Sequence, residues 1–381
     1  MKTEKSKQLH SALSSSLPDG DRQDDSSQEC GFVHLHVHSA FSLLEGAMPL
    51  KQILDLAKQD HQPAIAVTDR NNLFGALEFS QKAVSEGVQP IMGCKVAVDF
   101  GDGKDNQPKH GISEYPFLVF LAASEAGFEN LRKLVSESHL HSDGSEHAHV
   151  KLESVQRHNA GMICLTGGKD GPLFQLSLDN RSQDVRARLS TLAEIFSDRL
   201  YVELQRHTSE DYRVENSLIP LAHDLELPLV ATNQPYFAKR EDFEAHDALM
   251  CIAQGTVIAV TDRHQLTQEH YFKSQNEMRE LFKEIPEAIE NTVEIAKRCR
   301  FREITKAPIL PRFTEGDGAQ SVESTVQAES DELKRQARYG LIERLKINPG
   351  VKSAFFVAPC LSSPERSRRV PFYKKLFSQL R

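Results

Sequence analysis

The sequence lacks any run of about 18 apolar residues, so we expect no transmembrane helix. It also lacks an apolar segment behind Lys2, Lys5 and Lys7, and this argues against a secretory signal peptide. Its six cysteines form no Cys-x-x-Cys pair, so we predict reduced and mostly buried thiols. Together with a mean hydropathy of −0.45, these absences predict a soluble, cytoplasmic protein.

Basic residues are fewer than acidic ones, with 46 Lys or Arg against 54 Asp or Glu. The formal net charge of −8 argues against a protein that binds nucleic acid over its whole surface. It leaves open a local basic channel, or one supplied by another part of the protein. At 381 residues the chain is long enough for about two domains.

Strand and helix patterns alternate from Phe32 onward. They follow residues 1–30, a segment rich in Ser, Asp and Lys that we predict to be a disordered tail. Apolar residues recur at helical spacing after Pro49, in residues 128–135 and in residues 185–196. The predicted strands are residues 33–38, 64–68, 91–98, 117–122, 162–166, 200–204 and 229–232. This alternation predicts an α/β fold with a parallel sheet, open or closed into a barrel.

Residues 32–39 are the most informative stretch, because three histidines alternate there with apolar residues. In an extended strand, His34, His36 and His38 would project from one face. Neutral imidazoles that converge on one face are suited to binding a metal. Catalytic residues of such α/β folds collect at the carboxyl ends of the strands, where this sequence places its histidines and Asp69-Arg70.

The carboxyl-terminal part of the chain has a different character. From about Glu284 the pattern is helical, an extended proline-containing linker follows at residues 307–313, and a charged helix is predicted over residues 324–346. Residues 352–381 carry seven Lys or Arg against the single acid Glu365. This segment is either a non-native end, produced by a frameshift or truncation, or a basic tail for nucleic acid.

Several collinear motifs point to one family. They are residues 32–48, Thr68-Asp-Arg-Asn-Asn-Leu-Phe-Gly75, Pro90-Ile-Met-Gly-Cys94, residues 121–131, Cys164-Leu-Thr-Gly-Gly168, residues 229–233 and Ile309-Leu-Pro-Arg-Phe313. Together they resemble the start of bacterial DNA polymerase III alpha subunits, which is the polymerase-and-histidinol-phosphatase (PHP) domain.

The resemblance covers residues 31–349. It implies a distorted seven-stranded (β/α) PHP barrel over residues 31–283, followed by a mainly helical start of the polymerase palm over residues 284–349. Residues 350–381 do not match the family, and this favours the frameshift or truncation interpretation.

The family's reaction is template-directed DNA synthesis, in which palm aspartates hold two Mg²⁺ ions. Those aspartates lie beyond the matching region, so we do not expect this polypeptide to polymerise DNA by itself. The resemblance implies a proofreading exonuclease subunit as a partner of the PHP domain. DNA and the sliding clamp would bind only through the missing carboxyl-terminal regions, and no membrane is involved.

Active PHP domains hold a metal cluster with about nine side chains. The resemblance places His36, His38 and Glu45 at three of these positions. It places residues of other chemistry at the rest, namely Arg70, Lys95, Phe117, Gly168, Gln234 and Tyr236. Charged Arg and Lys cannot ligate a metal. We therefore expect no metal, no cofactor and no catalytic residue in this chain, with His36, His38 and Glu45 as vestigial positions.

Side-chain ion pairs are the expected replacement for the metals. In this hypothesis Arg70 or Lys95 pairs with Glu45, with Asp69 as a further partner, and the barrel mouth is a structural element. Two other functions stay open: a metal-dependent PHP-family phosphoesterase, and a non-catalytic binding module for the proofreading exonuclease subunit.

Overall fold

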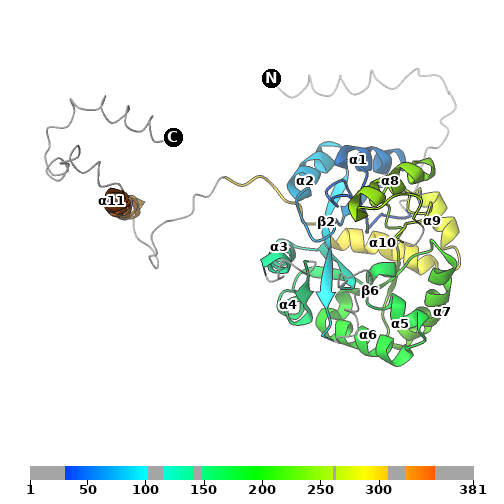
Figure 1. The fold of residues 1–381 in the computed structure, drawn as a ribbon. Coiled ribbons are helices and arrows are strands. Elements are labelled where there is room, and N and C mark those ends of the chain that lie inside the picture. The colour runs from blue at the N-terminus through cyan, green and yellow to red at the C-terminus, as the bar shows by residue number, and fades with distance from the viewer. Residues whose placement is uncertain (1–30, 102–114, 141–147, 261–262, 308–321, 348–381) are drawn as a thin grey trace, which may run out of the picture. The chain divides into compact units, whose positions relative to one another are not determined.

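The computed structural model describes residues 31–101, 115–140, 148–260, 263–307 and 322–347. The predicted tails, residues 1–30 and 350–381, lie outside this part of the chain. The strands are β1 (Ala64–Val67), β2 (Gln89–Asp99), β3 (Phe117–Ala122), β4 (Val150–Lys151), β5 (Met162–Leu165), β6 (Leu200–Leu204) and β7 (Leu229–Ala231). Figure 1 shows them enclosed by helices.

The helices are α1 (Leu50–Gln59), α2 (Ala76–Ser85), α3 (Glu125–Leu140), α4 (Leu152–Arg157), α5 (Phe174–Leu178), α6 (Ser182–Phe196), α7 (Ser209–Asp224), α8 (Phe243–Gln254), α9 (Gln275–Leu281), α10 (Pro286–Arg298) and α11 (Val322–Ile347). Short 3₁₀ turns are η1 (Gly168–Asp170), η2 (Ser197–Arg199) and η3 (Arg240–Asp242). The helices predicted after Pro49, at residues 128–135, at residues 185–196 and at residues 324–346 are confirmed as α1, α3, α6 and α11.

One curled, mixed sheet runs through the fold in the order β1-β2-β3-β5-β6-β7, with β4 paired to β2. β1 and β2 are parallel, as are β5, β6 and β7. β3 runs antiparallel to both of its neighbours, β2 and β5. The predicted α/β barrel-like class is confirmed, but the predicted all-parallel pairing is wrong. β2 and β3 are consecutive strands that pair directly, and an apolar pattern alone does not reveal strand direction.

The segment that carries the three histidines is extended but is not a β-strand, so this strand prediction is wrong. The carbonyls of His34 and Val37 accept hydrogen bonds from the N–H groups of Ala66 and Thr68, each at 2.9 Å. These acceptors are three residues apart, which breaks the two-residue period of a regular ladder. Side chains accept hydrogen bonds from other N–H groups of this segment: Thr292 from Val33, Gln62 from His34 and Thr68 from Val37.

Alternation along the strands divides the side chains between two faces of the curled sheet. The inner face carries a buried apolar cluster that includes Ala66, Ile91, Val119, Ile163 and Val230, closed by Ile295 and Cys299 at the end of α10. The same alternation turns Lys95 of β2 and Glu203 of β6 inward, because they lie an even number of residues from Ile91 and Tyr201. The inner face is therefore apolar near α10 and charged toward the carboxyl ends of the strands.

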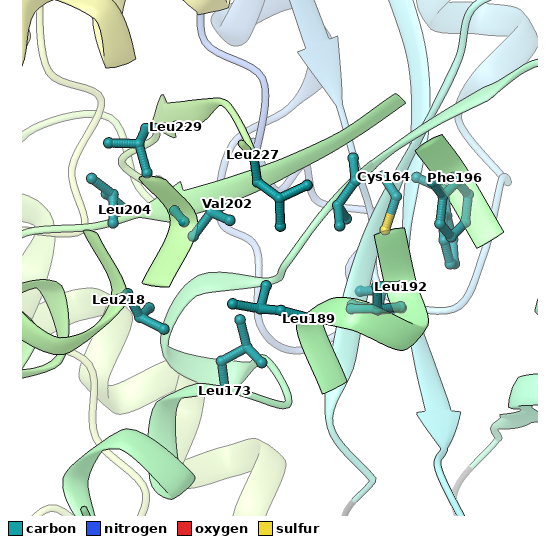
Figure 2. Packing of buried hydrophobic residues seen from close by; sticks show 14 of the residues in the cluster. Cys164, Leu173, Leu189, Leu192, Phe196, Val202, Leu204, Leu218, Leu227 and Leu229 are labelled. Carbon is teal, nitrogen blue, oxygen red and sulfur yellow. The ribbon is translucent and has the colours of Figure 1, made fainter. Parts of the chain in front are cut away.

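The outer face packs against the helices. Figure 2 shows Leu189, Leu192 and Phe196 of α6 and Leu218 of α7 together with Val202 and Leu204 of β6 and Leu229 of β7. α6 repeats its apolar residues at helical spacing, and this places Leu189, Leu192 and Phe196 on one buried stripe. Burying each such side chain contributes about 1.5–3 kcal/mol to folding. This outer core fixes the strands whose ends form the polar site.

The chain divides into two compact units, with the boundary after Thr305. α10 belongs to the first unit, since Asn291 donates a hydrogen bond to the Leu229 carbonyl of β7 at 2.8 Å. The predicted domain boundary between residues 283 and 284 stays a prediction. The described part of the second unit is dominated by α11, whose Val326 and Leu333 are exposed. Among the described residues, no helix combines the length and hydropathy needed to cross a membrane.

Candidate functional site

Polar side chains from five separate parts of the chain meet toward the carboxyl ends of the strands. Arg70 follows β1 and forms an isolated parallel bridge with Lys95 of β2. Asp170 ends the turn η1 after β5, while Gln234 and Tyr236 follow β7. We call Glu45, Arg70, Lys95, Asp170, Gln234 and Tyr236 the mouth cluster.

Arg70 forms an ion pair with Glu45, through Nη1 and Oε1. The two side chains are 29% and 19% exposed, so the pair lies at the rim of the cluster. The Arg70 guanidinium also lies over the Phe117 ring, 4.7 Å from its centre. Burial of the guanidinium works to lower its pKa, but the Glu45 carboxylate outweighs this and holds the pKa of Arg70 above its ordinary value. Glu45 is thus neutralised by a permanent side-chain cation.

Lys95 forms the second ion pair, with Asp170. The Lys95 side chain is only 2% exposed, and its Nζ also lies 3.4 Å from the Tyr236 hydroxyl and 5.0 Å from the centre of the Phe117 ring. Burial works to raise the pKa of Asp170, but the Lys95 ammonium outweighs it and holds that pKa far below its ordinary range. Asp170 is therefore ionised, and each mouth carboxylate has its own cation.

Gln234 links Asp170 to Tyr236 and His38. Its side-chain amide donates to the Tyr236 hydroxyl at 2.8 Å, and it lies 3.2 Å from Asp170 Oδ2 and 3.3 Å from His38 Nε2. The backbone of Gln234 has a φ of +48°, a left-handed conformation that few non-glycine residues adopt. This turn directs the amide toward His38 and Asp170 rather than along the chain.

His38 is fixed in one neutral form by its neighbours. Because the Ser42 hydroxyl donates its proton to Asp69, it accepts from His38, so His38 carries its proton on Nδ1 and donates it to Ser42 Oγ at 2.9 Å, while its unprotonated Nε2 faces the Gln234 amide. Its ring stacks on Tyr236, with centres 4.2 Å apart and planes 10° apart. Burial, reinforced by the Lys95 cation, holds the pKa of His38 well below its ordinary value. His38 is therefore a hydrogen-bonding link at neutral pH.

His36 makes a different contact, with Glu203 of β6. Its Nδ1 donates to Glu203 Oε1 at 2.7 Å, and both side chains are fully buried. Glu203 also accepts hydrogen bonds from Thr232, Gln205 and the Gly167 N–H. Burial works to raise the pKa of Glu203, but the His36 ring and these donors outweigh it and lower that pKa. His36 Nε2 is buried without a hydrogen-bond partner among the described residues.

Two predicted roles need correction. Asp69 does not pair with a cation among the residues the structure describes. Its carboxylate accepts hydrogen bonds from the Ser39 N–H, the Ser39 hydroxyl and the Ser42 hydroxyl, at 2.6–2.8 Å. Its side chain turns toward the 39–42 loop because that loop offers three donors. His34 also stands apart from the predicted metal face, since its Nε2 contacts the Lys273 carbonyl at 2.8 Å.

The residues at the mouth do not fit a metal cluster. The part of the chain that the structure describes contains no group of three or more His, Cys, Asp or Glu side chains arranged to hold a metal. The Gln234 amide faces His38 Nε2, and Arg70 and Lys95 hold the two carboxylates. Gly168 has a φ of +55°, a conformation in which any residue with a side chain is strained, and a Cβ there would lie 2.2 Å from the Gln205 side-chain amide. The expectation of no bound metal stays a prediction, to be tested by metal analysis.

Sequence reasoning missed two residues of this site, Asp170 and Glu203. Asp170 lies two residues beyond the position assigned to Gly168, on a turn whose direction the sequence does not show. For Glu203, the sequence did contain a signal that could have identified it as a residue of the site. It alternates with apolar Leu200, Val202 and Leu204 in a predicted strand, and an acid at an inward position of a buried strand needs a partner.

Comparison with known proteins agrees with this geometry. The PHP domain family matches residues 34–207. DNA polymerase III subunit alpha of Caulobacter vibrioides is 44% identical over 318 residues, which cover 83% of this chain and 27% of that protein. The Rickettsia bellii subunit is 35% identical over 315 residues, 82% of this chain and 25% of that protein. The chain thus spans about a quarter of the length of these relatives.

Among solved structures, an amidohydrolase from Chromobacterium violaceum aligns with a TM-score of 0.34 and 14% identity, over 54% of this chain and 87% of that one. A likeness at this level supports no functional conclusion. The sequence relatives and the domain match are sufficient to assign the family. The chain belongs to the family of DNA polymerase III alpha subunits and carries its PHP domain.

Proposed function

We propose that this chain supplies the PHP portion of a replicative DNA polymerase III alpha subunit, and that its mouth cluster is a structural element without hydrolytic activity. Template-directed DNA synthesis with Mg²⁺ would then be carried out in the cytoplasm by the longer polymerase, not by this PHP portion alone. Docking of a proofreading exonuclease subunit on the PHP portion is part of the same proposal. DNA and the sliding clamp would be bound by other regions of the polymerase.

One observation carries the proposal: each carboxylate at the mouth is paired with a side-chain cation, Glu45 with Arg70 and Asp170 with Lys95. A metal ion placed about 4 Å from either cation would face a repulsion of about 4 kcal/mol per pair of unit charges at an effective dielectric near 20. The two cations thus replace the charge that metal ions would bring. They also link the 39–45 loop, β2 and the turn after β5.

A metal-dependent phosphoesterase is the alternative, and the same observation weighs against it. Such an enzyme uses a metal to activate water or to polarise a phosphoryl oxygen. Here the carboxylates are committed to cations, and the Gln234 amide occupies His38 Nε2. At the mouth, His36 Nε2 is a buried nitrogen without a hydrogen-bond partner among the described residues, and one imidazole is too few ligands for a catalytic metal.

Metal analysis and phosphoesterase assays of the purified chain test the proposal. We expect no stoichiometric zinc or manganese and no Mn²⁺-dependent hydrolysis of a phosphodiester, in the wild type and in His36→Ala alike. Near-stoichiometric metal that is lost in His36→Ala, together with hydrolysis, would contradict it. As a control, Arg70→His with Lys95→Glu restores ligand chemistry at two positions, and this variant should gain metal affinity.

A chimaera tests the polymerase side of the proposal. In the Caulobacter vibrioides subunit, the matching region is replaced by residues 31–349 of this chain. We expect primer extension with Mg²⁺ to persist. A folded chimaera that is unable to extend a primer would mean that this PHP portion does not serve a polymerase.

A further inference from the structure

The turn that follows α8 has an unusual composition. Residues 257–260 read Val-Ile-Ala-Val, and the Val260 N–H donates to the Val257 carbonyl at 3.0 Å, as in a β-turn. Gly, Pro, Asn, Asp and Ser dominate such turns, because each favours the turn backbone or bonds to it. None of these residue types occurs at the four positions. Local conformational preference therefore does not explain this choice of residues.

The large apolar side chains of this turn face solvent. Val257 is 63% exposed, Ile258 60% and Val260 41%. Ile252, in the last turn of α8, is 70% exposed, while its neighbour Cys251 is buried. We call Ile252, Val257, Ile258 and Val260 the apolar tip. Packing within the first unit does not explain these side chains either, since so much of their surface is left in water.

Polar contacts fix the turn to the fold. Arg263 donates to both carboxylate oxygens of Asp247, at 2.7 and 2.6 Å, and its Nε donates to the Val260 carbonyl at 2.9 Å. Gln254 donates to the His264 carbonyl at 2.9 Å, which ties the two ends of the segment together. The polar groups thus bond to the fold while the apolar groups face water, the reverse of an ordinary surface turn. A segment held in this way loses little entropy when it binds.

The apolar tip carries no charge. Residues 248–260 contain no Asp, Glu, Lys or Arg, in a chain of which 26% is charged and whose net charge is −8. Arg263, which holds the turn, is paired with Asp247. A net charge of one sign keeps copies of a protein apart. An uncharged apolar face can still meet its own two-fold image, because no like charges are brought together there.

A second exposed turn provides a comparison. Leu43 and Leu44 are 65% and 51% exposed, and they lie between Ser42 and Glu45, whose N–H donates to the Ser42 carbonyl at 3.0 Å. A contact between two copies at this turn would remove the Glu45–Arg70 ion pair from water, which costs free energy. The apolar tip carries no such cost, so it is the better surface for a second copy.

We propose that the apolar tip is a self-association surface, through which two copies of the chain form a weak two-fold dimer. The same side chains meet from both copies, and their removal from water supplies the free energy of association. Four side chains form a patch far smaller than a stable interface, which buries about 1,600 Å² in total, so we expect a dissociation constant of about 100 μM. The dimer is independent of the proposed function, because no residue of the tip belongs to the mouth cluster.

Sedimentation velocity of the full chain over a concentration series tests this surface. The mean mass of the wild type should rise reversibly between about 10 and 300 μM. Val257→Ser with Ile258→Asn should raise the dissociation constant about tenfold and keep the fold, because Ser and Asn favour turns. The matched control, Leu43→Ser with Leu44→Asn, removes two exposed leucines from the other turn and should change the dissociation constant less than about twofold. Ile252→Lys tests the same surface from α8, since a two-fold contact would bring two lysines together.

Four outcomes would overturn the proposal. A wild type that stays monomeric up to about 300 μM would mean that the tip does not bind a second copy. Equal dissociation constants in the wild type and in the Val257–Ile258 double variant would place self-association on another surface. Equal losses in the two double variants would indicate non-specific apolar contact. A dimer that weakens as salt is raised from about 50 to about 500 mM would indicate ion pairs, because screening of the net charge should strengthen an apolar contact.

Discussion

The mouth cluster and the outer core beneath α6 and α7 are both buried, but different forces hold them together. In the outer core, apolar side chains such as Leu189 and Phe196 fill space, and each is fully buried. At the mouth, Lys95 is as deeply buried as these residues, yet it carries a charge. The core is stabilised by the removal of apolar surface from water, while the mouth is stable only because each charge has a partner.

The difference determines how each region responds to damage. A truncation in the core leaves a cavity, and the cost depends on the lost contacts alone. Removing one partner at the mouth leaves an uncompensated charge, and removing the second partner relieves it. Core losses should therefore add to one another when the sites are distant, whereas mouth losses should be coupled.

The largest expected loss of stability lies in the core. Phe196→Ala should lower the free energy of unfolding by about 4 kcal/mol, because the ring is fully buried and packs 5.9 Å from the Phe120 ring. Urea unfolding followed by circular dichroism measures it. Phe74→Ala is the control, since this ring is 66% exposed and its removal should cost less than about 0.5 kcal/mol. Equal losses in the two variants would mean that the α6 contact is not part of the core.

A smaller loss is expected at the mouth. Lys95→Met should cost about 2–3 kcal/mol, because it leaves Asp170 without its cation. The figure lies below the usual range for a buried pair because the Asp170 side chain is 32% exposed and water can reach it. The same urea unfolding experiment measures this loss, with the exposed Lys133→Met as its control.

The double variant Lys95→Met with Asp170→Asn tests whether losses at the mouth are coupled, unlike losses in the core. It should be more stable than Lys95→Met alone, since the stranded carboxylate is gone. If the two substitutions simply added their costs, the mouth would behave like the core, and the ion pair would not be what holds it together.

The positions of most elements could be predicted from the sequence, because apolar periodicity reports burial directly. α6 is an example, with Val185, Leu189, Leu192 and Phe196 on one face. The direction of β3 could not be predicted, since it is a continuous apolar run buried on both faces, the pattern usual for a parallel strand. The alternating pattern of residues 33–38 predicts a strand, but backbone N–H groups of this segment donate to the side chains of Thr68, Gln62 and Thr292 instead of to a neighbouring strand.

The sequence indicates which positions form the site, but it does not show which side chains contact one another there. Residue types at Arg70 and Lys95 indicate buried cations that need partners, and the resemblance places both near Glu45. Which carboxylate each cation would take depends on loop geometry. Asp69 is adjacent to Arg70 in sequence, yet its oxygens face Ser39 and Ser42, while Asp170 arrives from the turn after β5.

The smallest effect concerns pH, and it comes from a buried histidine outside both regions. Burial lowers the pKa of His34 from 6.5 to about 4 in the folded chain. Below pH 6.5 the unfolded chain therefore binds a proton that the folded chain does not, so stability falls as the pH is lowered from about 6.5 to about 4. Between pH 7 and pH 5 this single group should account for a loss of about 2 kcal/mol.

The variant His34→Gln checks this assignment. The glutamine amide can still donate to the Lys273 carbonyl but does not titrate, so this variant should lose about 2 kcal/mol less than the wild type between pH 7 and pH 5. Phe196→Ala should keep the wild-type pH dependence at a lower overall stability, because no proton binds in the outer core. If His34→Gln lost as much stability as the wild type over this pH range, the acid sensitivity would lie in other buried histidines, among which His207 also has a pKa lowered to about 4.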